Sequence, residues 1–204
     1  MASNQNFEMS DLEIQHNCIE TIINMLIARK WTTEPTDKLF EKIADPEELI
    51  DSKAVICNVI NRRVAIKFYN YKLTTMKNDK DIDTFIANYP DHHRILIVYD
   101  ILPKAEKQIQ DTKDFEVFKT MEIVRDISKH YLIPKHILLS KEEADQFMEE
   151  YSLKKRDMGR IFIDDPMARY LYAKKNDIIQ IIRGSIMSGY STYYRLVVSN
   201  SIYG

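Results

Sequence analysis

The sequence predicts a protein of the α/β class, α+β overall, that is built from two domains. β-Rich segments alternate with segments of helical periodicity through the first 130 residues, as in a mixed or parallel sheet covered by helices. The pattern changes at Pro134, after which short strands accompany two well-capped helices. A length of 204 residues fits one large or two small domains. We therefore expect one domain over residues 1–130 and a smaller one over residues 131–204.

The first helix is expected from about Asp11 to Lys30. Ser10 and Glu13 form a capping-box pattern, in which each side chain can bind the backbone N–H of the other residue. Isoleucines and leucines then recur at helical spacing up to Ile27. A polar loop containing Pro35 and a short helix over 38–44 should follow.

The rest of the first domain reads as alternating strands and helices. Its strands are expected at residues 63–69, 94–99 and 115–124, because these runs are apolar and β-rich. A helix over 81–89 places four apolar side chains on one stripe: Ile82, Phe85, Ile86 and Tyr89. Pro103 should open a short helix, since its missing N–H costs nothing at the first helical position.

The second domain contains two helix-start signals among four short strands. Ser140 and Glu143 form another capping box, and the helix that follows should bury Ala144, Phe147, Met148 and Tyr151. Asp165 should cap a helix whose first residue is Pro166. The strands are expected at residues 137–139, 161–163, 178–182 and 192–198.

Composition favours a soluble globular protein from a reducing compartment. Hydrophobic residues make up 45% of the chain, and no apolar run approaches the roughly 18 residues that span a bilayer. The polar N-terminus lacks a signal-peptide pattern. Cys18 and Cys57 lie in apolar contexts without a CxxC pair, so buried free thiols are expected. We therefore expect an intracellular protein with no membrane partner.

Charge and glycine content argue against several functions. The 29 basic and 31 acidic residues give a net charge of −2, whereas a free-standing nucleic-acid binder usually has a basic surplus. The first of the four glycines is Gly159, which argues strongly against a P-loop or a dinucleotide-binding turn in the first 158 residues. Neither a small-molecule ligand nor a cofactor is expected.

Metal binding is a minor alternative at two places. No pair among the five histidines has the i, i+4 spacing of a helical metal site, and the adjacent His92 and His93 are more simply surface or capping residues. Asp164 and Asp165 are a possible magnesium pair, but capping explains Asp165 better. We expect no metal site and no catalytic residue.

Basic and aromatic clusters also leave alternatives open. The basic runs 154–156 and 174–175 are most simply explained as solvent-exposed surface. Contact with nucleic-acid phosphates is the more specific alternative. Tyr190, Tyr193 and Tyr194 favour core or protein-interface positions over base stacking.

From His130 onward the chain resembles the assembly domain of the fifth subunit that eukaryotic nuclear RNA polymerases share and that has a homologue in archaeal RNA polymerase. The resemblance is carried by an ordered, gap-free series: His130, 132–136, 139–143, Arg160-Ile161, 165–170, 181–183, Ser185, Gly189 and 194–197. The preceding residues resemble the jaw domain of the eukaryotic form more weakly, through Phe115-Glu116-Val117-Phe118 and through a strand that ends at Tyr99 before Pro103.

This resemblance implies a non-catalytic subunit that assembles on the largest polymerase subunit and shapes the cleft for downstream duplex DNA. Pro103 and Lys104 are the expected DNA-proximal residues. The expected assembly interface consists of His136, Asp165, Pro166, Arg169, Tyr170, Arg183, Tyr194 and Arg195. The location would be the nucleus for a cellular polymerase, or host cytoplasm and virion for a viral one.

The sequence departs from the family at several positions, in a way that resembles versions encoded by large cytoplasmic DNA viruses. The family usually has glycine near Tyr172 and Asn176, and asparagine tolerates the left-handed turn that glycine would adopt. Further changes at Gly184, Tyr190 and Ser191 are expected to alter a surface loop and its contact with the largest subunit.

The alternative function is a stand-alone nuclease-like or DNA-binding protein. The family's jaw has a restriction-endonuclease-like core, in which an acidic metal ligand stands two residues before a lysine. The corresponding residues are Ala65, Ile66 and Lys67. Alanine offers no metal ligand, so nuclease activity is not expected.

Overall fold

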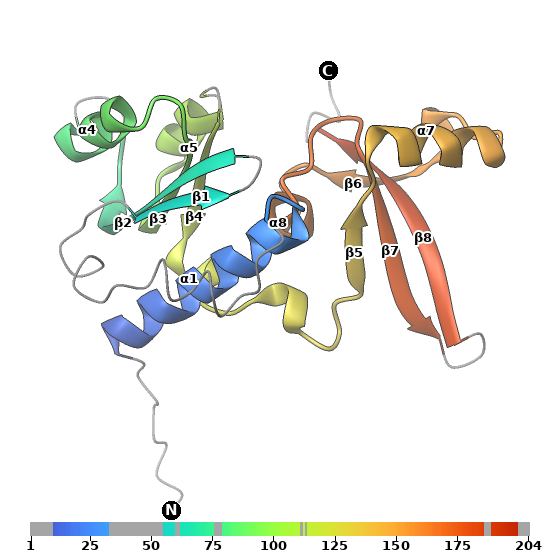
Figure 1. Cartoon of the computed structure of the whole chain (residues 1–204), viewed down its shortest axis with the longest axis horizontal. Coiled ribbons are helices and arrows are strands. Elements are labelled where there is room, and N and C mark those ends of the chain that lie inside the picture. The colour runs from blue at the N-terminus through green and yellow to red at the C-terminus, as the bar shows by residue number, and fades with distance from the viewer. Residues whose placement is uncertain are drawn as a thin grey trace, which may run out of the picture. The chain divides into compact units, whose positions relative to one another are not determined.

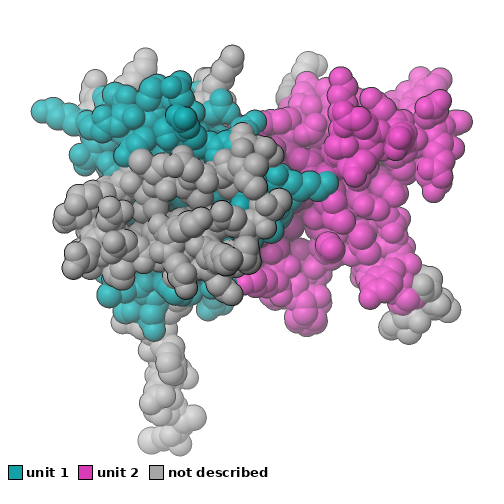
Figure 2. Space-filling model, in the orientation of Figure 1, with its two compact units in different colours: residues 1–125 teal, residues 126–204 magenta. Residues whose placement is uncertain are grey.

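The computed structural model describes residues 10–32, 55–59, 62–75, 79–110, 112, 114–185 and 189–199. The chain divides into two compact units, unit 1 over residues 1–125 and unit 2 over residues 126–204 (Figures 1 and 2). The division at residue 130 expected from the sequence therefore falls inside unit 2, just after the 3-10 helix Ile127–Lys129. The expected short helix over 38–44 lies outside the described residues.

Helix α1, Asp11–Ala28, begins with the predicted capping box. The Ser10 hydroxyl accepts a hydrogen bond from the Glu13 N–H, and the Glu13 carboxylate accepts one from the Ser10 N–H at 2.8 Å. The apolar stripe of α1 is fully buried at Ile19, Ile22 and Leu26. Cys18 lies on the same buried face as a free thiol, and burial raises its pKa to about 12.

The sheet of unit 1 is mixed, in the order β1-β2-β3-β4. Its strands are β1 Val55–Val59, β2 Arg62–Leu73, β3 His93–Ile101 and β4 Phe115–Lys119. Strands β2, β3 and β4 are parallel, and β1 runs antiparallel along β2. The connections after β2 and β3 are helices α4, Lys80–Asn88, and α5, Pro103–Gln110. This arrangement confirms the α/β expectation for the first unit.

Helices α4 and α5 cover one face of this sheet, and α1 covers the other. Ile82 and Phe85 of α4 and Ala105 of α5 share a core with Leu96 and Val98 of β3. Side chains alternate along a strand, so Glu116 points away from this core. The Glu116 carboxylate binds Arg29 at the end of α1, which places α1 on the opposite face.

The expected strand over 115–124 is partly wrong. Strand β4 ends at Lys119 and gives way to the short helix α6, Thr120–Ile123. The Glu122 carboxylate accepts a hydrogen bond from the Lys119 N–H at 3.2 Å, which satisfies one of the free N–H groups at a helix start. Ile123 is buried, so the apolar pattern of this segment continues although its backbone conformation changes.

The described part of unit 2 contains the sheet β5-β7-β8-β6, the α-helices α7 and α8, and two short 3-10 helices. The strands are β5 Lys135–Leu138, β6 Gly159–Phe162, β7 Ile178–Ser185 and β8 Gly189–Val198. Helix α7, Lys141–Glu150, begins with the predicted Ser140–Glu143 capping box, and α8, Pro166–Tyr170, begins at the predicted Asp165 cap. β7 pairs antiparallel with β5 and β8, and β6 runs parallel to β8.

Helix α7 packs on one face of this sheet. Phe147, Met148 and Ala144 contact a core formed by Met158, Ile178 and Leu196. The expectation that Tyr151 is buried with them is wrong, since 60% of this residue is exposed. Tyr151 follows the last helical residue, and its ring remains 5.1 Å from Phe147 at the edge of the core. No helix among the described residues has the length and apolar character needed to cross a membrane.

Candidate functional site

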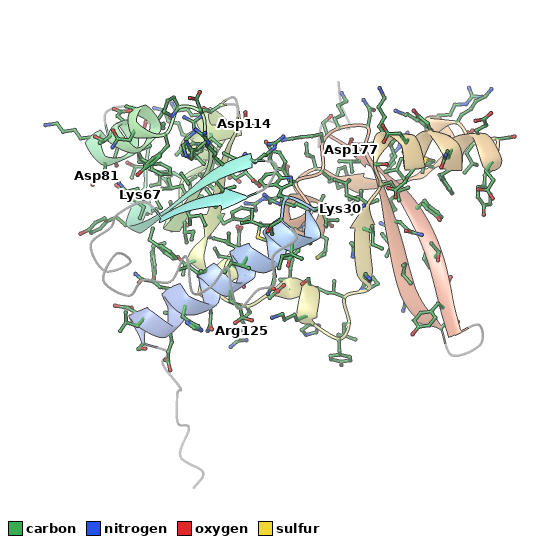
Figure 3. All side chains as sticks on the ribbon, in the orientation of Figure 1. Lys30, Lys67, Asp81, Asp114, Arg125 and Asp177 are labelled. Atoms are coloured by element: carbon green, nitrogen blue, oxygen red, sulfur yellow. The ribbon has the colours of Figure 1, made fainter. Side chains whose placement is uncertain are left out.

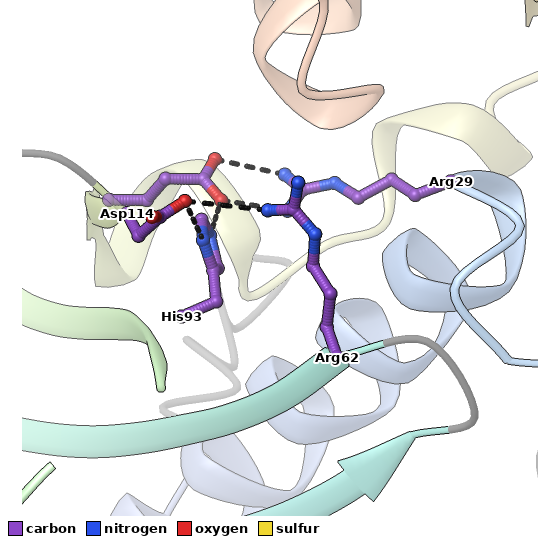
Figure 4. A network of polar contacts seen from close by, with 5 residues as sticks. Arg29, Arg62, His93 and Asp114 are labelled. Carbon is purple, nitrogen blue, oxygen red and sulfur yellow. Dashed lines mark hydrogen bonds and ion pairs between the residues drawn. The ribbon is translucent and has the colours of Figure 1, made fainter. Parts of the chain in front are cut away.

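A buried ionic network joins α1 to the sheet of unit 1 (Figure 4). The Arg29 guanidinium donates two hydrogen bonds to the Glu116 carboxylate, at 2.8 and 3.0 Å. His93 Nε2 lies 2.5 Å from the same carboxylate. Only 1% of the Arg29 and His93 side chains and 12% of the Glu116 side chain are exposed. The expectation that His93 is a surface or capping residue is therefore wrong.

The network keeps Glu116 ionised. Burial by itself would raise the pKa of this carboxyl group, but the charge of Arg29 and hydrogen bonds from His93 and Arg29 lower the pKa to about 2. Trp31 packs edge-on to the His93 ring, with centroids 4.8 Å apart. We call Arg29, His93 and Glu116 the buried ionic network. Its role is structural, because Arg29 and His93 already occupy the Glu116 carboxylate.

The position that corresponds to a nuclease site has no metal-binding chemistry. Ala65 is fully buried under α4 and α5, and Lys67 lies two residues further along the same face of β2. The Lys67 ammonium donates to the Asp81 carbonyl oxygen at 3.2 Å (Figure 3). Among the described residues there is no cluster of three His, Cys, Asp or Glu side chains that could hold a metal ion.

Pro103 and Lys104 lie at the carboxyl end of β3, where α5 begins, and both are exposed. At the same edge of the sheet, Asp100 binds Lys72 of β2 at 2.9 Å and Lys119 of β4 at 3.4 Å. The hydrogen bond from Lys72 is the main cause that lowers the pKa of Asp100 to about 2. This edge therefore presents three lysines from three neighbouring segments to solvent.

Three of the expected interface residues have structural roles within unit 2. The Asp165 carboxylate accepts a hydrogen bond from the Met167 N–H at 2.9 Å, and Pro166 occupies the first position of α8. Tyr170 is 5% exposed, and its hydroxyl accepts a hydrogen bond from Ser128 at 3.2 Å. These residues hold α8 in place; Tyr170 is buried, whereas Asp165 is half-buried and Pro166 is exposed. Arg169, on the same helix, is partly exposed.

The structure places the expected residues His136, Arg183 and Arg195 on one face of the unit 2 sheet. His136 is paired with Ile181, and Ile181 is paired with Tyr193, so the side chains of these paired residues lie on the same face. Arg183 and Arg195 lie two residues from Ile181 and Tyr193 on their strands, on the same face. Arg195 crosses β6, with Nη1 3.5 Å from the Arg160 carbonyl oxygen.

Tyr194 belongs to the opposite face. Its ring stacks on Phe147 of α7 with centroids 3.8 Å apart, and its hydroxyl accepts a hydrogen bond from Gln180 at 3.2 Å. Tyr193, by contrast, is 52% exposed between the two arginines. The sequence left core and interface positions open for both tyrosines, and strand alternation separates the exposed Tyr193 from Tyr194 once the register is known. We name His136, Arg183, Tyr193 and Arg195 the arginine–tyrosine face.

The departures at Gly184, Tyr190 and Ser191 lie in strands, which corrects their expected place in a surface loop. Gly184 pairs with Tyr190, and Ser191 pairs with Arg183. Beyond Ile182 no described residue of β5 pairs with β7, so these positions form a two-stranded ribbon. The differences therefore fall next to the arginine–tyrosine face.

Tyr172 and Asn176, where the family usually has glycine nearby, both adopt the left-handed conformation, with φ of 55° and 74°. The Asn176 N–H binds the Val197 carbonyl oxygen at 2.9 Å, so the turn is fixed to β8. We expect Asn176→Val to lower the free energy of unfolding by about 1–2 kcal/mol, because a branched side chain opposes positive φ. Asn176→Gly should not lower it. Thermal unfolding of both variants measures the difference, and equal melting temperatures would contradict it.

Comparison with known proteins identifies the relatives of each part of the chain. Residues 125–197 match the family described as "RNA polymerase Rpb5, C-terminal domain". The chain is 48% identical over 73 residues to DNA-directed RNA polymerase subunit Rpo5 of Thermofilum pendens, covering 36% of this chain and 91% of that protein.

Two longer relatives extend the similarity beyond this domain. The chain is 32% identical over 134 residues to DNA-directed RNA polymerase subunit 5 of Acanthamoeba polyphaga mimivirus, which covers 66% of this chain and 65% of that protein. It is 33% identical over 109 residues to DNA-directed RNA polymerases I, II, and III subunit rpabc1 of Dictyostelium discoideum, covering 51% of this chain and 55% of that protein. The chain thus matches less than two thirds of either longer relative.

Proposed function

Because the chain belongs to the family of DNA-directed RNA polymerase subunit 5, we propose that unit 2 docks on the largest polymerase subunit and that unit 1 forms a jaw beside downstream DNA. The chain is a non-catalytic subunit of a multisubunit RNA polymerase, and the complex, not this chain, is the enzyme. The observation that carries this function is the match of residues 125–197 to the subunit's C-terminal domain.

Assembly through unit 2 is supported by the surface that this unit offers. The arginine–tyrosine face combines exposed arginine and tyrosine side chains, the residue types that contribute most to protein interfaces. It includes three of the positions at which the resemblance predicts the interface, namely His136, Arg183 and Arg195. Asp165, Pro166 and the buried Tyr170 support this unit by fixing α8, and Arg169 adds a partly exposed cation.

A jaw role for unit 1 is supported by the lysines at the carboxyl edge of its sheet. Lys104 is exposed beside Pro103, and Lys72 and Lys119 are held nearby by Asp100. Lysine contacts with phosphate position a duplex without reading its sequence. With a net chain charge of −2, most of the positive charge near the DNA comes from the other subunits.

The similarity to a mimivirus subunit supports a polymerase encoded by a large cytoplasmic DNA virus. Such a subunit would act in host cytoplasm and be packaged in the virion, whereas a cellular one would act in the nucleus. The nuclease alternative finds no support, since Ala65 cannot bind magnesium and Lys67 is bound to α4.

Two single variants test the separate roles of the units. We expect Arg169→Ala to reduce incorporation into the polymerase more than Lys104→Ala does, because Arg169 belongs to unit 2 and Lys104 to the DNA-proximal edge. The measurement is the ratio of tagged subunit to largest subunit in purified complexes. Lys104→Ala should instead reduce photo-cross-linking of the complex to downstream DNA. Equal incorporation of both variants would count against this division of roles.

A further inference from the structure

The charged residues on the strands of the unit 2 sheet are all basic. Its four strands contain no aspartate or glutamate, and they contain the exposed basic residues Lys135, Arg160, Arg183 and Arg195. Helix α7, by contrast, has five acidic residues and one lysine. Unit 2 as a whole is nearly neutral, with twelve basic and ten acidic residues; its strands carry four of the basic and none of the acidic residues, and the rest of the unit has a small acidic excess.

Two of these arginines frame an exposed tyrosine on the arginine–tyrosine face. Arg183 lies diagonally across from Tyr193, and Arg195 follows Tyr193 by two residues on β8. Neither guanidinium forms an ion pair with the residues that the structure describes, and Arg195 contacts only a backbone oxygen. The two charges are therefore available to an anionic partner.

The same part of β8 has an open backbone edge. β8 pairs with β7 over Gly189–Leu196, but β6 pairs with it only from Arg195 to Val198. Among the described strands, none pairs with the other edge of residues 191–194. Unpaired N–H and C=O groups along a strand edge bind an extended peptide by β-strand addition.

We propose that this surface binds an extended acidic segment of a protein partner, which adds as a strand beside β8 residues 191–194 and places its carboxylates near Arg195 and Arg183. The inference rests on the proposed function and gives the chemistry of the segment with which another polymerase subunit meets unit 2. Bidentate arginine–carboxylate pairs beside a tyrosine supply affinity, and the strand edge fixes the register.

The observations favour a peptide over a nucleic acid as the ligand. A strand edge recognises a peptide backbone, which a nucleic acid lacks. The affinity of a duplex also depends on a basic surplus, which the nearly neutral unit 2 lacks.

The test compares charge reversal on the two faces of the same sheet. The full tagged chain is co-expressed with the two largest polymerase subunits, as wild type, as Arg183→Glu/Arg195→Glu and as Arg160→Glu. Arg160 is an exposed arginine that pairs with Leu196 and so belongs to the opposite face. We expect the double variant to recover at least tenfold less of its partners, and Arg160→Glu to change recovery less than twofold.

Each outcome bears on the inference. Equal recovery by wild type and double variant would overturn it while leaving the proposed function intact, whereas no recovery by wild type would overturn both. Release of the partners by nuclease treatment would replace the peptide with a nucleic acid and also overturn it. If the double variant does not show the wild-type thermal unfolding, Arg183→Gln/Arg195→Gln takes its place, and the same tenfold criterion applies.

Discussion

Replacing Arg29 by methionine is expected to lower the free energy of unfolding by about 3–5 kcal/mol, the typical cost of removing one partner of a buried ion pair. Methionine has a similar length but no charge, so Glu116 would stay buried with His93 as its remaining partner in the network. Unfolding in urea, followed through the fluorescence of Trp31, measures the effect. Trp31 is the single tryptophan and contacts His93, so its signal reports on unit 1.

Arg63→Met is the matched control, because Arg63 is an exposed arginine on β2. Its substitution should change stability by less than about 0.5 kcal/mol, as for most surface positions. If both variants unfold at the same urea concentration, the network does not stabilise unit 1 as described.

Acid is expected to weaken unit 1 through Glu116. The folded-state pKa of this carboxyl group is about 2, whereas its ordinary value is 4.5. As pH falls below 4.5 the unfolded chain takes up a proton that the folded chain does not, so the stabilisation is lost between about pH 4.5 and 2. The shift corresponds to roughly 3 kcal/mol over that interval.

The Glu116→Gln variant isolates this contribution. Glutamine cannot titrate, so the variant should be less stable than wild type near pH 7 but lose stability less steeply from pH 4.5 downward. Other carboxylates with lowered pKa, such as Asp100, titrate in both proteins and cancel in the comparison. Parallel plots of unfolding free energy against pH would show that Glu116 is not the group responsible.

Local signals in the sequence predicted most of the secondary structure. The capping boxes at Ser10 and Ser140 and the Asp165–Pro166 start each mark a helix because their hydrogen bonds join residues two or three apart. The apolar residues of the segment 120–123 suit either a strand or a helix, and the segment forms a helix whose start has a hydrogen bond from the Lys119 N–H to Glu122.

The buried ionic network and the arginine–tyrosine face could not be predicted in the same way. Arg29 and Glu116 are separated by 87 residues, and no local spacing links them. The interface residues were named from a motif, which does not say which strand face each side chain occupies. Register supplies that information: it directs Tyr193 toward the arginines and Tyr194 toward α7.

The central claim is that this chain is a structural subunit of an RNA polymerase, and affinity purification of the tagged full-length protein from the cells or virions that contain it tests that claim most directly. We predict that mass spectrometry of the purified material recovers the two largest polymerase subunits with it, and that the chain alone leaves DNA uncut in the presence of magnesium. Recovery of the chain without polymerase subunits, together with DNA cleavage that Lys67→Ala abolishes, would contradict this function.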